Sequence, residues 1–394
     1  MTLSLVRRAL LTAALLVPLL LSGCWDKDEL NELAVVIGVG LDKKSDHNYE
    51  VTAQVIKPSP GGQGGGGQGG GAEVPTWSLS ANGKTVMDAI HQLNKISPRQ
   101  MYWSHLQLII FGEDLAKEGI APVINWFERD RRSRSGTYTV VTHGTAEDLL
   151  NQKIELGKVP AKAMADLLET SDDRQLSARK TSLRDLLARL STPGIDVSMD
   201  VIDPRKIRGQ VETYELTGTA FFKSDRLQGY LTGQEATAVE FIEGKINEGV
   251  LLVPCPNQPD EWVTFQITQI RSRLTVDAAD GKVKPKADLQ LEGNFGDQTC
   301  AADLQDPKDR MRLQEDIEKA VIKSIQTAYK QTAELESDLF GIGRELRRRH
   351  PKVWQQKNAQ GWNKQLSEIP LDLSVKVEIR RPGLIFQPTP TKIK

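Results

Sequence analysis

The apolar and polar positions of the N-terminal half predict strands that alternate with helices. Residues 33–57 contain two β-rich runs around a polar turn, which indicates a hairpin. Residues 76–97 favour a strand, an Asn-Gly turn and a helix, and residues 105–132 a buried strand followed by helix. Residues 136–150 repeat the order of strand and helix. This alternation is typical of an α/β region.

Two further helical segments, near residues 161–169 and 182–190, precede the helix-breaking sequence Ser-Thr-Pro-Gly-Ile-Asp at 191–196. We therefore expect the N-terminal α/β region to span residues 24–200. A glycine run at 61–71, interrupted only by two glutamines, predicts a long flexible loop inside this region.

The C-terminal half shows a different pattern. Residues 214–232 and 262–294 each indicate a hairpin, and residues 307–336 a long helix with one apolar stripe. Residues 371–379 alternate apolar and polar side chains, as in a half-buried strand. We expect residues 201–394 to form an α+β region with a largely antiparallel sheet, a long helix packed on one face, and a division into two subdomains near 258. The whole chain is then a multidomain protein of mixed α and β structure.

The first residues have the pattern of a secretory signal peptide. Arg7 and Arg8 precede an apolar stretch that ends just before Cys24, and this stretch is short for a membrane span. The tripeptide Leu-Ser-Gly before Cys24 fits a lipobox, so residues 1–23 are expected to be removed and Cys24 to carry a diacylglyceryl group. The alternative is an ordinary signal peptide followed by a buried cysteine. Two acyl chains of about 15 methylenes each, at ~0.8 kcal/mol per methylene, would supply on the order of 20 kcal/mol of membrane attachment.

The segment after Cys24 turns at once to acidic, helix-starting sequence. Asp26 and Glu29 resemble a capping box, and Trp25 has the amphipathic character of a side chain at headgroup level, although packing onto the domain is the alternative. We treat this segment as a membrane-proximal motif. Its members are Trp25, Asp26, Glu29, Leu30 and Asn31.

The net charge of the chain indicates which classes of partner it can bind. Removal of Arg7 and Arg8 with the signal peptide lowers Lys plus Arg from 51 to 49, against 52 Asp plus Glu. Nearly neutral charge argues against nucleic-acid binding.

The five histidines are scattered singly and no catalytic or metal-binding motif is present, so we expect neither an enzyme nor a metal or other cofactor. Gly38 and Gly40 lack the third glycine and the following helix of a dinucleotide motif.

Two cysteines and two arginine clusters remain as candidate sites. Cys255 and Cys300 flank strand-like segments, and either a disulfide or two buried thiols fits them in an oxidising compartment. The arginines would either favour a helix C-terminus or dock acidic partner surfaces or lipid headgroups. The two clusters are Arg129, Arg131, Arg132 and Arg134, and Arg347, Arg348 and Arg349.

Several stretches together resemble the Ger(x)C family, the lipoprotein C subunits of nutrient germinant receptors in endospore-forming bacteria. The stretches are Gly-Cys-Trp-Asp-Lys-Asp-Glu-Leu-Asn-Glu-Leu at 23–33, and residues 97–130, 218–236 and 338–354. Residues in the family's expected places are Pro98, His105, Gly112, Glu113, Gly119, Arg129, Asp130, Gly341, Gly343, Pro351 and Trp354. The glycine run at 61–71 and the pair of Cys255 and Cys300 depart from the family pattern.

The resemblance implies a non-enzymatic accessory subunit at the outer face of the spore inner membrane. It would be held by its lipid and would assemble with integral-membrane A and B receptor subunits, and we expect its soluble domain to be a monomer. The alternative functions are a solute-binding lipoprotein of an importer and a lipoprotein enzyme acting on the cell wall. A solute binder should have two similar α/β lobes, whereas the second region here has an antiparallel pattern.

Overall fold

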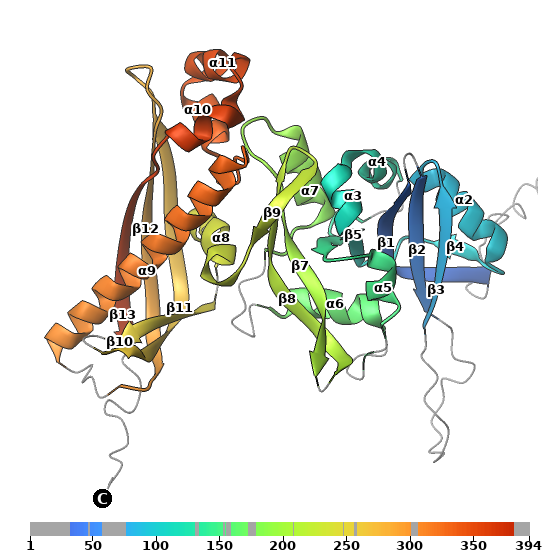
Figure 1. Cartoon of the computed structure of the whole chain (residues 1–394), viewed down its shortest axis with the longest axis horizontal. Coiled ribbons are helices and arrows are strands. Elements are labelled where there is room, and N and C mark those ends of the chain that lie inside the picture. Colours follow the sequence, from blue (N-terminus) through green and yellow to red (C-terminus); the bar gives the residue numbers. More distant parts are fainter. Residues whose placement is uncertain are drawn as a thin grey trace, which may run out of the picture.

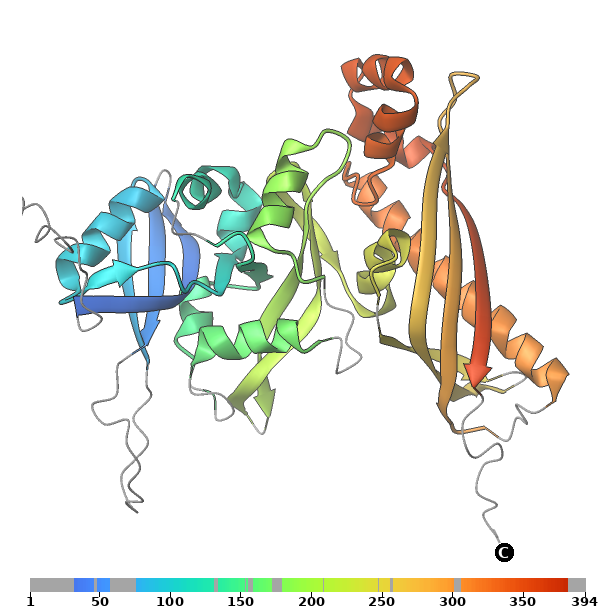
Figure 2. The same ribbon diagram turned by 180° about the vertical axis from the view of Figure 1, so that it is seen from behind.

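The computed structural model describes residues 32–45, 48–56, 76–130, 134–152, 154, 159–171, 179–207, 209–246, 248–255, 258–300 and 306–381. The signal peptide, Cys24, the membrane-proximal motif, the glycine run and two arginines of the first cluster lie outside these ranges. Figures 1 and 2 show two sheets arranged along the long axis of the molecule.

Nine of the described strands form the first sheet. They are β1 (Leu33–Ser45), β2 (Asn48–Ile56), β3 (Thr76–Gly83), β4 (Gln100–Tyr102), β5 (Leu108–Gly112), β6 (Tyr138–Thr142), β7 (Ser198–Ile207), β8 (Gln210–Lys223) and β9 (Arg226–Leu231). The order is β3-β2-β1-β5-β6-β7-β8-β9, with β4 paired to β1. Strands β1, β5, β6 and β7 pair in parallel, β4 also joins β1 in parallel, and the remaining pairings of this sheet are antiparallel. The expected α/β region is therefore confirmed as a mixed sheet with a parallel centre.

Helices cover both faces of this sheet. They are α2 (Val86–Ile96), α3 (Glu113–Glu118), α4 (Ala121–Arg129), α5 (Ala146–Leu150), α6 (Pro160–Glu169) and α7 (Leu183–Ser191). Side chains of α2, α3, α4 and α7 share one apolar cluster with the sheet, and those of α5 and α6 share another. Gly38 and Gly40 permit the second packing, because a Cβ on Gly38 would lie 2.2 Å from Ala161 Cβ and one on Gly40 2.9 Å from Ala146 Cβ.

The second sheet has the order β10-β11-β12-β13. Its strands are β10 (Gly249–Cys255), β11 (Gln258–Asp277), β12 (Lys284–Gln298) and β13 (Asp372–Arg381). The first three are antiparallel, and β13 joins β12 in parallel after the long helix α9 (Pro307–Glu334). The expected largely antiparallel sheet with a long helix on one face is confirmed.

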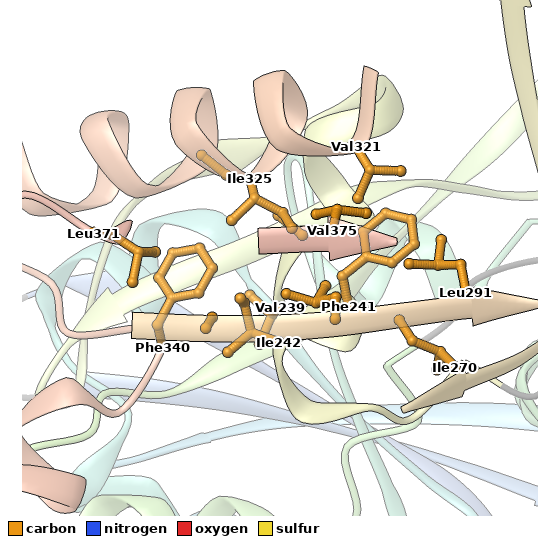
Figure 3. Packing of buried hydrophobic residues seen from close by; sticks show 14 of the residues in the cluster. Val239, Phe241, Ile242, Ile270, Leu291, Val321, Ile325, Phe340, Leu371 and Val375 are labelled. Atoms are coloured by element: carbon orange, nitrogen blue, oxygen red, sulfur yellow. The ribbon is translucent and has the colours of Figure 1, made fainter. Parts of the chain in front are cut away.

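The core of the second region lies between this sheet and its helices. Figure 3 shows Phe241 of α8 (Ala238–Glu243) and Val321 and Ile325 of α9 gathered around Val375 of β13 and Leu291 of β12. All five belong to one buried apolar cluster. The remaining elements are η2 (Gly233–Thr237), α10 (Ile342–Arg349), α11 (Pro351–Ala359) and η3 (Trp362–Glu368).

The change from one sheet to the other falls later than the boundary predicted near residue 200. Residue 200 lies inside β7, and the first sheet continues to Leu231, because the hairpin of β8 and β9 pairs with β7. Residue 258 likewise begins β11, which pairs with β10. Strand pattern alone did not reveal this, because an antiparallel hairpin can extend a parallel sheet at its edge as well as begin a new sheet.

Candidate functional site at the junction of the two sheets

The arginine clusters lie at or near the ends of helices. Arg129 is in the last turn of α4, exposed, and Arg134 is also exposed beyond it, whereas Arg131 and Arg132 lie outside the described residues. The second cluster forms the last turn of α10. Positive charge is favourable in the last turn of a helix, so Arg129 and the second cluster each have a local structural reason for their position. Figures 1 and 2 show α4 and α10 in different parts of the molecule, so the structure does not bring the two clusters together.

Within the second cluster the three arginines differ. Arg348 and Arg349 both pair with Glu345, and Arg348 donates from Nη2 at 2.7 Å. The hydrogen bond from Arg348, with that from Arg349, holds the pKa of Glu345 below its usual value. Arg347 is exposed and forms no ion pair within the described part of the chain. It is therefore the member of this cluster best placed to meet another molecule.

The two cysteines form a disulfide, with a Cα–Cα distance of 6.4 Å. Cys255 ends β10, and Cys300 follows β12. Both are buried. The bond therefore ties together two segments at one end of the second sheet, and the structure favours the disulfide over two free thiols.

A buried carboxylate, Asp338, organises the junction between the sheets. Its Oδ1 accepts from Ile342 N at 2.9 Å, and its Oδ2 accepts from Gly343 N at 2.7 Å and from Trp362 Nε1 at 2.8 Å. Asp338 is 2% exposed, and burial raises its pKa to about 6 although these hydrogen bonds lower it. Because two of its donors are the first backbone N–H groups of α10, Asp338 fixes the start of that helix.

Asp196 meets this site from the first region, in the loop between α7 and β7. Its Oδ2 accepts from Asp338 N at 2.7 Å and from Asn363 Nδ2 at 2.9 Å, and its Oδ1 accepts from Ser224 N at 2.7 Å. In addition, Asp196 N donates to Asp338 O at 2.8 Å. The loop, the β8–β9 turn and the segment before α10 are thus held by one hydrogen-bonded group, to which the carboxylates contribute as acceptors.

Glycines allow the loop between α7 and β7 to pack closely against the start of α10. Gly194 has φ +83°, and a Cβ there would lie 2.4 Å from Gly343 C. A Cβ on Gly343 would lie 2.5 Å from Trp362 Nε1 and 2.7 Å from Trp354 Cζ3. Gly341 has φ +73°, a conformation that glycine adopts without strain. The glycines at 341 and 343 therefore serve a turn and close packing.

A second polar group joins the regions beside the junction. Arg179 donates to Glu240 at 3.0 Å and to Glu243 at 3.1 Å, and Arg189 also pairs with Glu243. These four side chains are 10% exposed or less. The positive charges of Arg179, Arg189 and Lys245 outweigh burial and hold the pKa of Glu243 at about 2. Nothing in the spacing of these residues along the sequence pointed to this group.

The carboxyl ends of the parallel strands carry further polar side chains. Asp42, at the end of β1, accepts from Ala146 N at 2.8 Å and Glu147 N at 2.9 Å, and burial raises its pKa to about 6. Gly112 leaves room for it, because a Cβ there would lie 2.0 Å from Asp42 Oδ1. Just after β6, His143 Nδ1 lies 2.7 Å from Oδ2 of Asp203 in β7.

Among the described residues, no group of three or more His, Cys, Asp or Glu side chains is placed to hold a metal ion. The same residues include no helix that combines the length and the apolar character needed to cross a membrane.

Sequence reasoning found part of the junction. The stretch at 338–354 was singled out by family resemblance, and it contains Asp338 and both packed glycines. The sequence pattern indicates Asp196 only as part of a break between regions. Pro193 and Gly194 predict a turn just before Asp196, but a turn motif does not identify the residues that the turn contacts.

Comparison with known proteins yields two consecutive family matches. The model of the spore germination protein N-terminal domain matches residues 26–204, and the spore germination B3/GerAC-like C-terminal model matches residues 217–383. Together the two matches span most of the described structure. The boundary between them, at residues 205–216, falls within β7 and β8 of the first sheet.

Full-length relatives carry spore germination names. Spore germination protein KC of Bacillus subtilis (strain 168) is 28% identical over 406 residues, which cover 99% of each chain. Spore germination protein A3 of the same organism is 25% identical, over 93% of this chain and 95% of that protein. Spore germination protein GerQC of Bacillus cereus is 20% identical, over 94% and 98%.

The crystal structure of the GerBC protein is similar in fold. It aligns with a TM-score of 0.53 at 18% sequence identity, and covers 90% of this chain and 100% of that one. The fold assembled from the two sheets is therefore also found in a solved structure.

Proposed function

Because this chain belongs to the Ger(x)C family of spore germination proteins, we propose that it is a non-enzymatic lipoprotein subunit of a spore nutrient germinant receptor. Lipidated at Cys24, it is held at the outer face of the spore inner membrane. There it assembles with integral-membrane A and B subunits and permits germination. The observation that carries the proposal is the pair of family matches, which together span both sheets.

The distance along the chain between anchor and fold supports a role beside the membrane. Strand β1 begins at Leu33, nine residues after Cys24. A fully extended chain spans at most about 3.5 Å per residue, so this linker reaches roughly 30 Å. A lipid at Cys24 would therefore keep the first sheet close to the bilayer, within reach of membrane-embedded subunits.

The anchor is tested by Cys24→Ala. Without the acylation site the protein should leave the membrane fraction or remain unprocessed, and nutrient-triggered germination should fall, because on the order of 20 kcal/mol of attachment is lost. A second variant, in which an unrelated transmembrane helix replaces residues 1–24, should restore membrane attachment and germination. Recovery of the Cys24→Ala protein in the membrane fraction, processed and active, would refute the anchor.

The arginine clusters are proposed as docking surfaces for the partner subunits. Exposed charges contribute little to folding stability but steer association and fix its register. Reversal of Arg347 to Glu, or of Arg131, Arg132 and Arg134 together, should leave the melting temperature nearly unchanged and reduce co-purification with receptor subunits.

Arg348→Glu is the matched control for the second cluster, because this arginine is already paired with Glu345. We expect it to impair co-purification less than Arg347→Glu. Normal assembly and germination in both cluster variants would place the docking surface elsewhere, with the motif at residues 25–31 as the next candidate.

A further inference from the structure

A cavity of about 400 Å³ lies beside the junction of the two sheets. The first region contributes Arg179 and, from α7, Arg189. The second contributes Glu243 of α8, Lys245 just after it, and Arg344 of α10. The volume falls within the range usual for small-molecule sites. Any molecule bound here would contact both regions at once.

Positive charge exceeds negative charge in this cavity. Arg179, Arg189 and Lys245 all converge on one carboxylate, Glu243, with Lys245 Nζ at 2.9 Å from Oε2. Arg179 has a second partner in Glu240, whose pKa burial raises. Two carboxylates therefore face three cations before Arg344 is counted.

The other acidic side chains lining the cavity are engaged elsewhere. Asp185 forms the capping box of α7 with Ser182, and Glu345 accepts from Arg348 and Arg349. Arg344 is exposed and forms no ion pair within the described residues. Burial, the nearby charge of Arg179 and, to a smaller extent, the charge of Arg344 lower the pKa of Arg189 to about 10, so the guanidinium groups of Arg344 and Arg189 lie near each other. The four cations of the cavity, Arg179, Arg189, Lys245 and Arg344, therefore outnumber the two carboxylates that pair with them, Glu240 and Glu243.

We propose that this cavity binds a small oxyanion carrying two or more negative charges, of the phosphate or polycarboxylate class. Guanidinium groups present paired N–H donors that match the oxygens of such anions. Arg344 and Lys245 contact the anion from the open side, and Arg179 and Arg189, held in place by Glu240 and Glu243, supply the buried positive charge.

Binding would strengthen the contact between the sheets. Arg344 is already fixed through its backbone, because Arg344 N donates to Gly194 O across the junction at 2.7 Å. An anion held between Arg344 and Arg189 adds a second connection from α10 to α7. Its occupancy thus favours the arrangement of the two regions seen in the structure. This site stands on its own geometry and does not depend on the proposed receptor role.

The test is calorimetric titration of the full chain, purified in detergent, with inorganic phosphate and with citrate, against sodium chloride of matched ionic strength. We expect saturable binding of phosphate, citrate or both, and none of chloride. Arg344→Gln should weaken the affinity at least tenfold, because it removes a charged hydrogen-bond donor to the anion. Lys245→Gln, at a side chain 63% exposed, should weaken it in the same direction.

Arg347→Gln is the matched control, because it removes the same charge from the same helix but does not line the cavity. Unchanged affinity in this control together with the loss in Arg344→Gln supports the site. Equal losses in both variants would identify non-specific attraction to a basic surface and overturn it. Absence of binding by either anion up to about 10 mM, far above a Kd of 1 mM or less, would also overturn it. Germination and receptor co-purification are separate measurements, so failure here leaves the proposed function standing.

Discussion

Replacing Gly194 by alanine probes the junction most directly. The new Cβ would lie 2.4 Å from Gly343 C and 2.5 Å from Arg344 N, both backbone atoms that cannot rotate away. Overpacking of this kind costs about 1–3 kcal/mol. The left-handed backbone at φ +83° adds roughly 1–2 kcal/mol for any residue with a Cβ. The free energy of unfolding should therefore fall by about 2–5 kcal/mol.

Gly281→Ala separates these two effects. Gly281 has φ +78°, but its Cβ would meet nothing within 4 Å, so this variant should lose only the backbone contribution of about 1–2 kcal/mol. Urea denaturation measures both variants. Hydrogen exchange of the amides of Asp338 and Arg344, which donate across the junction, should accelerate in Gly194→Ala alone. Equal losses of stability in the two variants would show that the regions do not pack as closely as described.

Three further predictions concern the stability and assembly of the chain. Burial raises the pKa of Asp42, of Asp338 and of Asp200, a buried residue of β7, to about 6 from 3.8, so the folded protein binds a proton on each of these carboxylates more tightly than the unfolded chain. Their contribution is full below about pH 4 and is lost as pH rises through 6, so urea unfolding should show greater stability at pH 5 than at pH 7, by on the order of 1 kcal/mol per group; a flat or opposite profile would contradict this. Replacing both Cys255 and Cys300 by alanine should cost about 2–4 kcal/mol, and reductant should reproduce the loss in the unchanged protein but have no effect on the variant. The chain from residue 25 onward should sediment as a monomer at micromolar concentration, and a tight dimer would refute that expectation.

Much of the fold followed from local pattern. The pattern at residues 182–190 predicts a helix, and Ser182 is the N-cap of α7 in a capping box. The helix expected at 307–336 is α9, and its buried stripe includes Leu313, Ile317, Ser324 and Ala328. The turns at Ser224–Asp225 and at Asp280–Gly281 lie between β8 and β9 and between β11 and β12. These features depend on residues a few positions apart, which a sequence displays directly.

The sequence by itself determined the kinds of element and the family, because periodicity, capping residues and turn chemistry act over a few residues and the motifs are contiguous. Only the tertiary structure decided which sheet the β8–β9 hairpin joins, and that Asp196 meets Asp338 across 142 positions of sequence. It also decided that Arg179 and Arg189 share Glu243. Such contacts arise when distant segments pack and bury polar groups that must then find partners, and the requirement for a partner does not specify which distant residue provides it.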